Sequence, residues 1–279
     1  MGGARLEGST GGASADERMR RVLELLEERE AVSVTELSRG FSVSEVTIRN
    51  DLALLARQGL VARVRGGARA LQRGQSEISF DVRLQVEAAA KRAIARAAAA
   101  MVADGEAVAL DSSTTAFYIA LELRDKRELV VVTNGLRLAS ALADAPGVSV
   151  IVPGGLVRTA AMSVVGDFAS SVLRNTRIGH GFFGARGISA DLGLMDLNPD
   201  EVKIKREMAD VCERVVGVFD HTKWARSALF SFVPTERIDG IVTDEAAPAD
   251  LVQEWRARKV DVVTAASRPK EVPDTIERV

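Results

Sequence analysis

Residues 18–69 read RMRRVLELLEEREAVSVTELSRGFSVSEVTIRNDLALLARQGLVARVRGGAR. The first part of this stretch has the i, i+3, i+4, i+7 apolar spacing of an amphipathic helix, at Met19, Val22, Leu23 and Leu26. Residues 34–40 predict a second, shorter helix that ends at a glycine. With the segments that follow, the pattern predicts three short helices and a hairpin, the layout of a winged helix-turn-helix.

The third helix is expected to begin after Ser44, because a serine hydroxyl accepts a hydrogen bond from a free N–H of the first turn. Gly59 lies just past its expected end, where a left-handed C-cap is common. At 100° per residue, one face is apolar and the opposite face is small, polar and cationic, which suits a major groove. The apolar face has Ile48, Leu52 and Leu55; the other has Val46, Asn50, Ala53 and Arg57, flanked by Thr47 and Arg49.

A short strand pair with arginines near its tip is expected over residues 60–67. Residues 39–73 hold seven arginines against Glu45 and Asp51, a net charge of +5, whereas the whole chain carries −2. Basic charge is therefore concentrated beside the three helices, which predicts double-stranded DNA as the partner.

The predicted DNA-contacting residues fall into two groups. Arg63 and Arg65 on the hairpin suit phosphate or minor-groove contact. The third helix suits base contact, because Asn can pair bidentately with adenine and a Val or Thr methyl can touch a thymine methyl. For any single arginine the alternative is a solvated surface, and for the helix-opening serine it is a purely capping role. The groove candidates are Ser44, Val46, Thr47, Arg49 and Asn50.

The length of 279 residues predicts two domains, and 47% hydrophobic residues are ample for a buried core. No apolar run reaches 18 residues, so no membrane span is expected. The N-terminus lacks the apolar core of a secretory signal, and the cytoplasm is the expected compartment. The expected division is a flexible tail (1–16), a winged helix-turn-helix domain (17–69), a linker (70–86), a sensor domain (87–265) and a C-terminal tail (266–279).

A single cysteine, Cys212, excludes an intrachain disulfide and any multi-cysteine metal site. The apolar residues around it predict a buried structural thiol inside a helix. His180 and His221 are the only histidines, and two scattered histidines do not indicate a metal site. No metal and no cofactor is therefore expected.

Beyond the linker, short apolar runs alternate with helical segments, which predicts an α/β domain around a mostly parallel sheet. Helices are expected at 87–103, 115–123 and 136–142. Strands are expected at 107–110, 129–132, 148–152, 181–183, 215–219, 238–242 and 260–263.

Polar or glycine-rich turns follow these strands, and such sheets bind ligands at the carboxyl ends of their strands. Hydroxyls and N–H groups at a helix start suit a phosphate, although Ser113 or Thr114 could simply cap the helix. A Gly-Gly turn with an incidental arginine is the alternative at 153–158, and a favourable i, i+4 pair is the alternative for Glu201 and Lys205. The predicted effector-binding residues are Asp111, Ser112, Ser113, Thr114, Thr115, Asn134, Gly154, Gly155, Arg158, Gly184, Glu201, Lys205, Asp220 and Lys223. Together these groups fit a small polyhydroxylated phosphate.

The string SVSEVTIRNDLALLARQGLVARVRGGA resembles the DNA-binding domain of the DeoR family of bacterial transcription regulators. The segments DSSTT, VVTNGLRLA, VPGGLVR, FFGARGIS, EVKIKREM and FDHTK resemble its sensor domain. The resemblance spans about residues 17–265 and implies an isomerase-like sensor that binds phosphorylated sugars. Asn50 stands where the family commonly has arginine, Arg65 where it has histidine, and Ser113 where it has glycine.

The leading hypothesis is a transcriptional repressor of a sugar or polyol catabolic operon, acting as a homodimer or homotetramer and controlled by a phosphorylated sugar. An aldose–ketose phosphate isomerase with an appended DNA-binding domain is the alternative, with Asp111, Glu201 or Asp220 beside Lys223 as its acid–base pair. The third hypothesis is a purely architectural DNA-binding protein whose second domain is degenerate.

Overall fold

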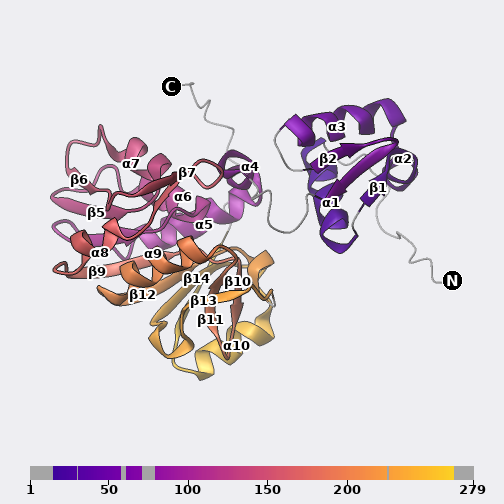
Figure 1. The fold of residues 1–279 in the computed structure, drawn as a ribbon. Coiled ribbons are helices and arrows are strands. Elements are labelled where there is room, and N and C mark those ends of the chain that lie inside the picture. The colour runs from indigo at the N-terminus through magenta and orange to yellow at the C-terminus, as the bar shows by residue number, and fades with distance from the viewer. Residues whose placement is uncertain (1–14, 30, 58–60, 71–78, 225, 267–279) are drawn as a thin grey trace. The chain divides into compact units, whose positions relative to one another are not determined.

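The computed structural model describes residues 15–29, 31–57, 61–70, 79–224 and 226–266. The chain divides into two compact units, residues 1–86 and 87–279 (Figure 1). Each unit has its own core and is described by itself.

The first unit contains helices α1 (Ala15–Glu28), α2 (Val34–Phe41) and α3 (Glu45–Arg57). Strands β1 (Ala31–Ser33), β2 (Val61–Val64) and β3 (Gly67–Ala70) form an antiparallel sheet of order β1-β3-β2. The three helices and the β2–β3 hairpin confirm the predicted winged helix-turn-helix. Strand β1 was not predicted, since three residues are too few to show a period of two. The expected cap at Gly59 falls outside the described residues.

The core of the first unit joins all three helices. Val22 of α1, Leu37 of α2, and Ile48 and Leu52 of α3 are fully or almost fully buried. This is the apolar face that the helical spacing predicts. The charged pair Arg18 and Asp51 is buried with them, with 2.6 Å between Nε and Oδ2. Because the pair joins α1 to α3, it fixes the orientation of the helix whose outer face is predicted to contact DNA.

The expected linker, residues 70–86, contains one short helix, α4 (Phe80–Gln85). Phe80 at its start is buried, and the Arg83 guanidinium lies 5.8 Å from the Phe80 ring centroid. Six residues span less than two turns, so no helical periodicity could appear in the sequence. The expected N-terminal tail, 1–16, likewise overlaps the start of α1 at Ala15.

The second unit is built on seven parallel strands in the order β15-β14-β12-β9-β4-β5-β6. This confirms the predicted α/β class, with strands within a few residues of their expected positions. The strands are β4 (Ala107–Leu110), β5 (Leu129–Thr133), β6 (Val148–Ile151), β9 (Ile178–Phe183), β12 (Cys212–Val218), β14 (Gly240–Asp244) and β15 (Asp261–Ala265). The helices are α5 (Ala88–Ala99), α6 (Thr114–Glu122), α7 (Leu136–Leu142), α8 (Phe168–Leu173), α9 (Pro199–Asp210) and α10 (Ala249–Ala257).

The winding of this sheet reverses between two neighbouring strands, β4 and β9. From β4 the chain proceeds through β5 to β6 at one edge, and from β9 through β12 and β14 to β15 at the other. Right-handed crossovers therefore place α6 and α7 on one face and α9 and α10 on the other. Ligands of open parallel sheets bind beyond the carboxyl ends of the strands at such a reversal. The residues that follow β4 and β9 are thus the first place to look for a site.

Two antiparallel additions were not predicted. Strands β7 (Leu156–Arg158) and β8 (Ser163–Val165) form a hairpin, and β10 (Gly187–Ser189), β11 (Gly193–Asp196) and β13 (Phe230–Val233) form a small sheet. Two single-turn 3₁₀ helices, η1 (His221–Lys223) and η2 (Thr235–Arg237), follow β12 and β13. Strands of three or four residues leave no readable alternation in the sequence.

Cys212 is the first residue of β12, so its predicted placement inside a helix is wrong. Its predicted burial is confirmed: Cys212 is 5% exposed and its thiol donates to the Met208 carbonyl at 3.1 Å. Helix α9 ends at Asp210, two residues before this cysteine.

We expect the Cys212 thiol to resist alkylation in the folded chain, because burial raises its pKa to about 12 and only the thiolate is the nucleophile. Incubation with iodoacetamide at pH 8 should leave the native protein unmodified by mass spectrometry, whereas the urea-unfolded chain gains one adduct. Modification of the native chain at the unfolded rate would contradict this burial.

In the part of the chain that the structure describes, no helix is long and apolar enough to cross a membrane.

Candidate functional site

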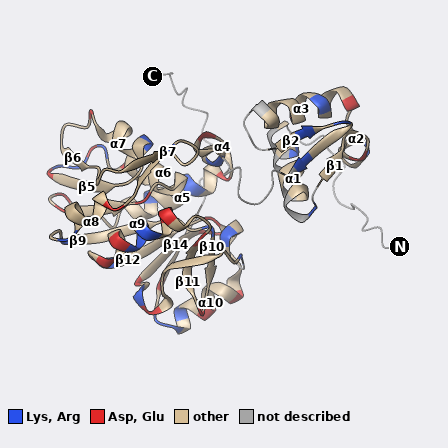
Figure 2. Cartoon of the chain, in the orientation of Figure 1, with Lys and Arg blue, Asp and Glu red and all other residues tan. Residues whose placement is uncertain are grey.

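The outer face of α3 is exposed as its spacing predicts. Val46 is 62% exposed, and Arg49 and Asn50 are exposed beside it, whereas Ile48 on the inner face is fully buried. Figure 2 shows basic residues on α3 and on the β2–β3 hairpin of this unit. The candidate DNA-binding surface thus combines a helix face and a basic wing.

Most polar groups at the start of α3 already have partners. The Ser44 hydroxyl accepts from the Thr47 N–H at 3.1 Å, as expected of an N-cap, and lies 2.9 Å from the Thr47 hydroxyl. The Arg49 guanidinium donates to Glu45 at 2.7 Å, and the Thr35 hydroxyl of α2 donates to the same carboxylate. These bonds hold the first turn of α3 in one arrangement.

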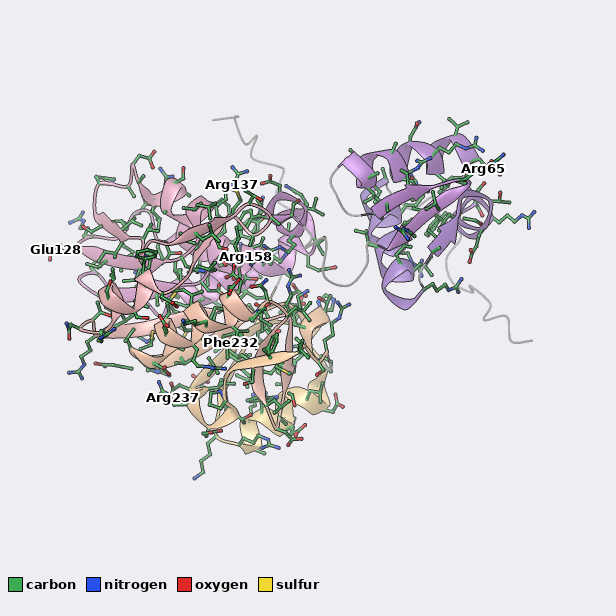
Figure 3. The ribbon with its side chains drawn as sticks, viewed as in Figure 1. Arg65, Glu128, Arg137, Arg158, Phe232 and Arg237 are labelled. Carbon is green, nitrogen blue, oxygen red and sulfur yellow. The ribbon has the colours of Figure 1, made fainter. Side chains whose placement is uncertain are left out.

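The two wing arginines lie differently. Arg63 of β2 donates from Nη1 to the Arg49 carbonyl of α3 at 3.0 Å, so it braces the wing against the helix. Arg65 is exposed at the hairpin tip, beside Gly66 with a φ of +82° (Figure 3). Arg65 therefore extends toward solvent as a phosphate contact requires, while part of Arg63 is engaged within the domain.

In the second unit, Asp111 and Gly184 meet where the winding reverses. Asp111 follows β4 and is fully buried, and its Oδ2 accepts from the Gly184 N–H at 2.9 Å. The same carboxylate lies 3.0 Å from the Lys205 ammonium of α9, and its Oδ1 accepts from the Ser113 N–H. Three elements distant in the sequence thus converge on one carboxylate.

Lys205 is 4% exposed and lies between two carboxylates. Besides Asp111, it contacts Asp196 at 2.7 Å, donates to the Gly184 carbonyl at 3.1 Å, and lies 5.0 Å from the Phe232 ring centroid. Burial lowers the pKa of Lys205, but the charges of Asp111 and Asp196 outweigh it and the net pKa is raised. Burial raises the pKa of Asp196, but Lys205 outweighs it and the net pKa is lowered. Lys205 therefore stays charged inside the protein.

Glu201 collects donors from four further segments. Its Oε1 accepts from Arg158 at 2.7 Å and from Ser163, and its Oε2 accepts from Ser112 and Asn134, each at 3.2 Å. The i, i+4 pair expected between Glu201 and Lys205 is therefore wrong, because each side chain binds other partners in the buried interior. Both side chains face the strand ends instead of the helix surface.

Asn134 follows β5 and is fully buried. Its Nδ2 donates to Glu201, but its Oδ1 has no hydrogen-bond donor among the residues that the structure describes. An unsatisfied buried acceptor costs about 1–3 kcal/mol. This oxygen is therefore a place where a ligand hydroxyl would be favoured.

The loop 111–115 is confirmed as a helix start. The Ser113 hydroxyl accepts from the Ala116 N–H at 3.1 Å, so the capping alternative holds for this residue. Thr114 is the first residue of α6, and both it and Thr115 are buried. A Cβ at Gly184 would come within 2.4 Å of the Ser113 Cβ, so Ser113 packs directly on that glycine.

Gly154 and Gly155 have φ values of +82° and +135° in the turn before β7. A Cβ at Gly155 would lie 2.2 Å from the Val165 carbonyl oxygen of β8, so this glycine permits the close approach of the two hairpin strands. The alternative of a structural Gly-Gly turn thus accounts for Gly155, while the arginine that follows, Arg158, does enter the charged cluster.

Asp220 and Lys223 lie at the end of β12, which β9 separates from β4. Strand ends two positions apart are about 10 Å distant. Asp220 is 1% exposed and accepts from the Thr222 N–H at 3.0 Å. Burial raises its pKa, but Lys223 and Thr222 outweigh this and the net pKa is lowered.

Sequence reasoning missed Ser163 and Asp196, which the β8 and β11 strands bring to Glu201 and Lys205. Both residues lie in short antiparallel strands and do not follow a strand of the parallel sheet. A search for polar residues after the predicted parallel strands therefore does not include them. His221 contacts Asp244 at 2.8 Å and His180 contacts Glu106 at 3.2 Å, in two separate places. Within the described residues no group of His, Cys, Asp and Glu could hold a metal ion.

A cavity of about 290 Å³ lies between β10, α10 and the residues Trp224, Arg226 and Ser227, with Trp224 and Trp255 in its wall. None of the charged residues described above lines it. The candidate effector site is therefore the group of buried charges at the strand ends.

Comparison with known proteins gives matches over both units. Residues 18–73 match the DeoR-like helix-turn-helix domain and residues 86–245 the DeoR C terminal sensor domain. The chain is 36% identical over 249 residues to a putative aga operon transcriptional repressor of Escherichia coli O157:H7, covering 88% of this chain and 93% of that one. It is 31% identical over 237 residues to the glycerol-3-phosphate regulon repressor of Escherichia coli K12, covering 85% and 94%. A solved D-ribose-5-phosphate isomerase in complex with phospho-erythronic acid matches 48% of this chain and 53% of that chain, with a TM-score of 0.38 and 12% identity.

Proposed function

Since the chain belongs to the DeoR family of transcription regulators, we propose that it represses an operon for the use of a sugar or polyol and that a phosphorylated sugar controls its binding to operator DNA. The observation that carries the proposal is the buried cluster of Asp111, Glu201, Lys205 and Arg158 where the sheet reverses its winding. Relatives named for the aga operon and for glycerol 3-phosphate support the class of effector.

The isomerase alternative is excluded. The relatives are named transcriptional repressors, and the family carries a DNA-binding helix-turn-helix domain, so the chain is a regulator and not an enzyme.

The charged cluster offers separate partners for the two ends of a sugar phosphate. The Arg158 guanidinium is 17% exposed and paired with Glu201, so a phosphate dianion would compete with that carboxylate for its N–H groups. The unsatisfied Asn134 Oδ1 and the carboxylates suit hydroxyl donors. Ligand binding would then exchange bonds between the β7–β8 hairpin and α9, a change that paired DNA-binding domains could sense in a homodimer or homotetramer.

The proposal is tested by fluorescence anisotropy with duplex DNA from upstream of the protein's own gene. We expect salt-dependent, specific binding that one member of a panel of glycerol, pentose and hexose phosphates releases. By linkage, that compound must bind less tightly when operator DNA is present, which calorimetry with and without DNA measures. Specific DNA binding unaffected by every compound would leave an architectural DNA binder as the better description.

Replacing Arg158 by methionine should raise the effector concentration needed for half release by roughly 10- to 150-fold, because a charge-assisted hydrogen bond is worth about 1.5–3 kcal/mol. The matched control is Arg177→Met, which removes an exposed arginine paired with Glu213 before the start of β9. Equal effector responses of the two variants would remove Arg158 from the site.

A further inference from the structure

Two side chains on the outer face of α3 stand apart from their neighbours. Val46 and Asn50 are four residues apart, so they lie about 40° apart around the helix axis and about 6 Å apart along it. Val46 is 62% exposed and Asn50 is also exposed, while Ile48 and Leu52 on the opposite face are fully buried. The pair faces away from the core of its unit.

The described polar side chains that flank this face have hydrogen-bond partners within the protein. Arg49 binds Glu45, Ser44 and Thr47 bind each other, and Arg63 binds a backbone carbonyl of α3. In contrast, the Asn50 carboxamide forms no hydrogen bond with any residue in the described part of the chain. It therefore presents one acceptor and two donors to whatever approaches the helix.

We propose that Asn50 and Val46 are the base-reading pair of this helix and that they select neighbouring A·T base pairs in each half of the operator. The carboxamide of Asn50 matches the N6 donor and N7 acceptor of adenine in the major groove, and the Val46 methyl groups match the thymine C5-methyl. Their separation of about 6 Å along the helix corresponds to one or two base steps of about 3.4 Å.

The arginines around this pair contribute affinity and position the helix, and they do not read bases. Arg65 at the wing tip binds phosphate and contributes affinity without sequence preference. Arg49 and Arg63 position α3 and the wing through their contacts with Glu45 and the helix backbone. The inference rests on the proposed function, because it specifies which bases the proposed repressor reads.

The first test is selection from a duplex library with a randomised core, using the full-length wild type and the variants Asn50→Ala, Asn50→Arg and Arg65→Ala. We expect the wild type to enrich an adenine at one position of each half-site. Asn50→Ala should remove the preference at that position, with a loss of roughly 5- to 150-fold in discrimination between adenine and the other bases. Asn50→Arg should enrich guanine there. Arg65→Ala should weaken binding to all sequences and leave the selected motif unchanged.

The second test removes single thymine methyl groups by placing deoxyuridine in the selected duplex. At one position the wild type should lose roughly 3- to 5-fold in affinity, about the value of one buried methyl group, whereas Val46→Ala should lose nothing further there. Circular dichroism of each variant shows whether the helices are retained.

The failure of the base-reading assignment and the failure of the proposed function give different results. A motif whose adenine position is unchanged in Asn50→Ala, or deoxyuridine losses equal in wild type and Val46→Ala, would overturn the base-reading assignment while sparing the repressor. Failure of the wild type to enrich any sequence at low salt would instead overturn the proposed function itself.

Discussion

Replacing Lys205 by methionine is expected to lower the free energy of unfolding of the second unit by about 3–5 kcal/mol, the usual cost of removing one partner from a buried ion pair. The ammonium lies 3.0 Å from Asp111 and 2.7 Å from Asp196, and all three side chains are almost fully enclosed. Without it, two carboxylates remain inside the protein with their counter-charge removed. The same substitution should abolish release from DNA by the effector, since it disrupts the cluster proposed to bind it.

Urea unfolding followed by tryptophan fluorescence measures this loss directly, because Trp224 and Trp255 both lie in the second unit. The matched control is Lys203→Met on the same helix, which removes an exposed partner of Asp167 and should change stability little. Adding Asp196→Asn to Lys205→Met should recover part of the loss, because one uncompensated carboxylate is then removed. Equal midpoints for the two lysine variants would show that Lys205 is not buried between carboxylates.

Replacing Asp51 by alanine should destabilise the first unit by about 3–5 kcal/mol and abolish DNA binding. Two guanidinium nitrogens of Arg18 contact this carboxylate, at 2.6 and 3.2 Å, and both residues are less than 10% exposed. A small domain has a total stability of about 5–15 kcal/mol, so the loss is a large fraction of what holds α3 in place.

The two units allow a clean measurement of this effect. Hydrogen exchange of amides in α1 and α3 should accelerate in Asp51→Ala, while tryptophan fluorescence, which reports only on the second unit, keeps its wild-type urea midpoint. Glu36→Gln serves as control, because its pair with Arg29 is about half exposed. Retained DNA affinity in Asp51→Ala would show that the buried pair does not support the recognition helix.

The elements that sequence reasoning found are those with a long or repeated pattern. The inner face of α3 repeats every three or four residues, and the seven parallel strands are continuous apolar runs between helices. Both patterns arise directly from burial, since a helix buries one stripe and a covered parallel strand buries both faces. The residues after those strands, such as Asp111 and Asn134, could therefore be placed at one edge of the sheet from the sequence.

Elements too short to repeat their characteristic spacing of apolar residues escaped prediction. Helix α4 has six residues and β7, β8 and β10 have three each. Their formation depends on contacts with distant parts of the chain, such as the burial of Phe80 or the approach of Gly155 to β8. Ser163 and Asp196 were missed for the same reason, although they complete the partners of Glu201 and Lys205.

The amino-acid sequence by itself determined the two-part architecture, the outer face of α3 and the set of polar strand ends, because each follows from periodicity and local backbone preference. Only the tertiary structure decided how those groups pair. Glu201 and Lys205 have ideal spacing for a surface ion pair, yet each binds other residues, because α9 packs this face against the strand ends. Inside the protein an unpaired charge is so costly that the available partners, brought together from distant segments, determine which contacts form.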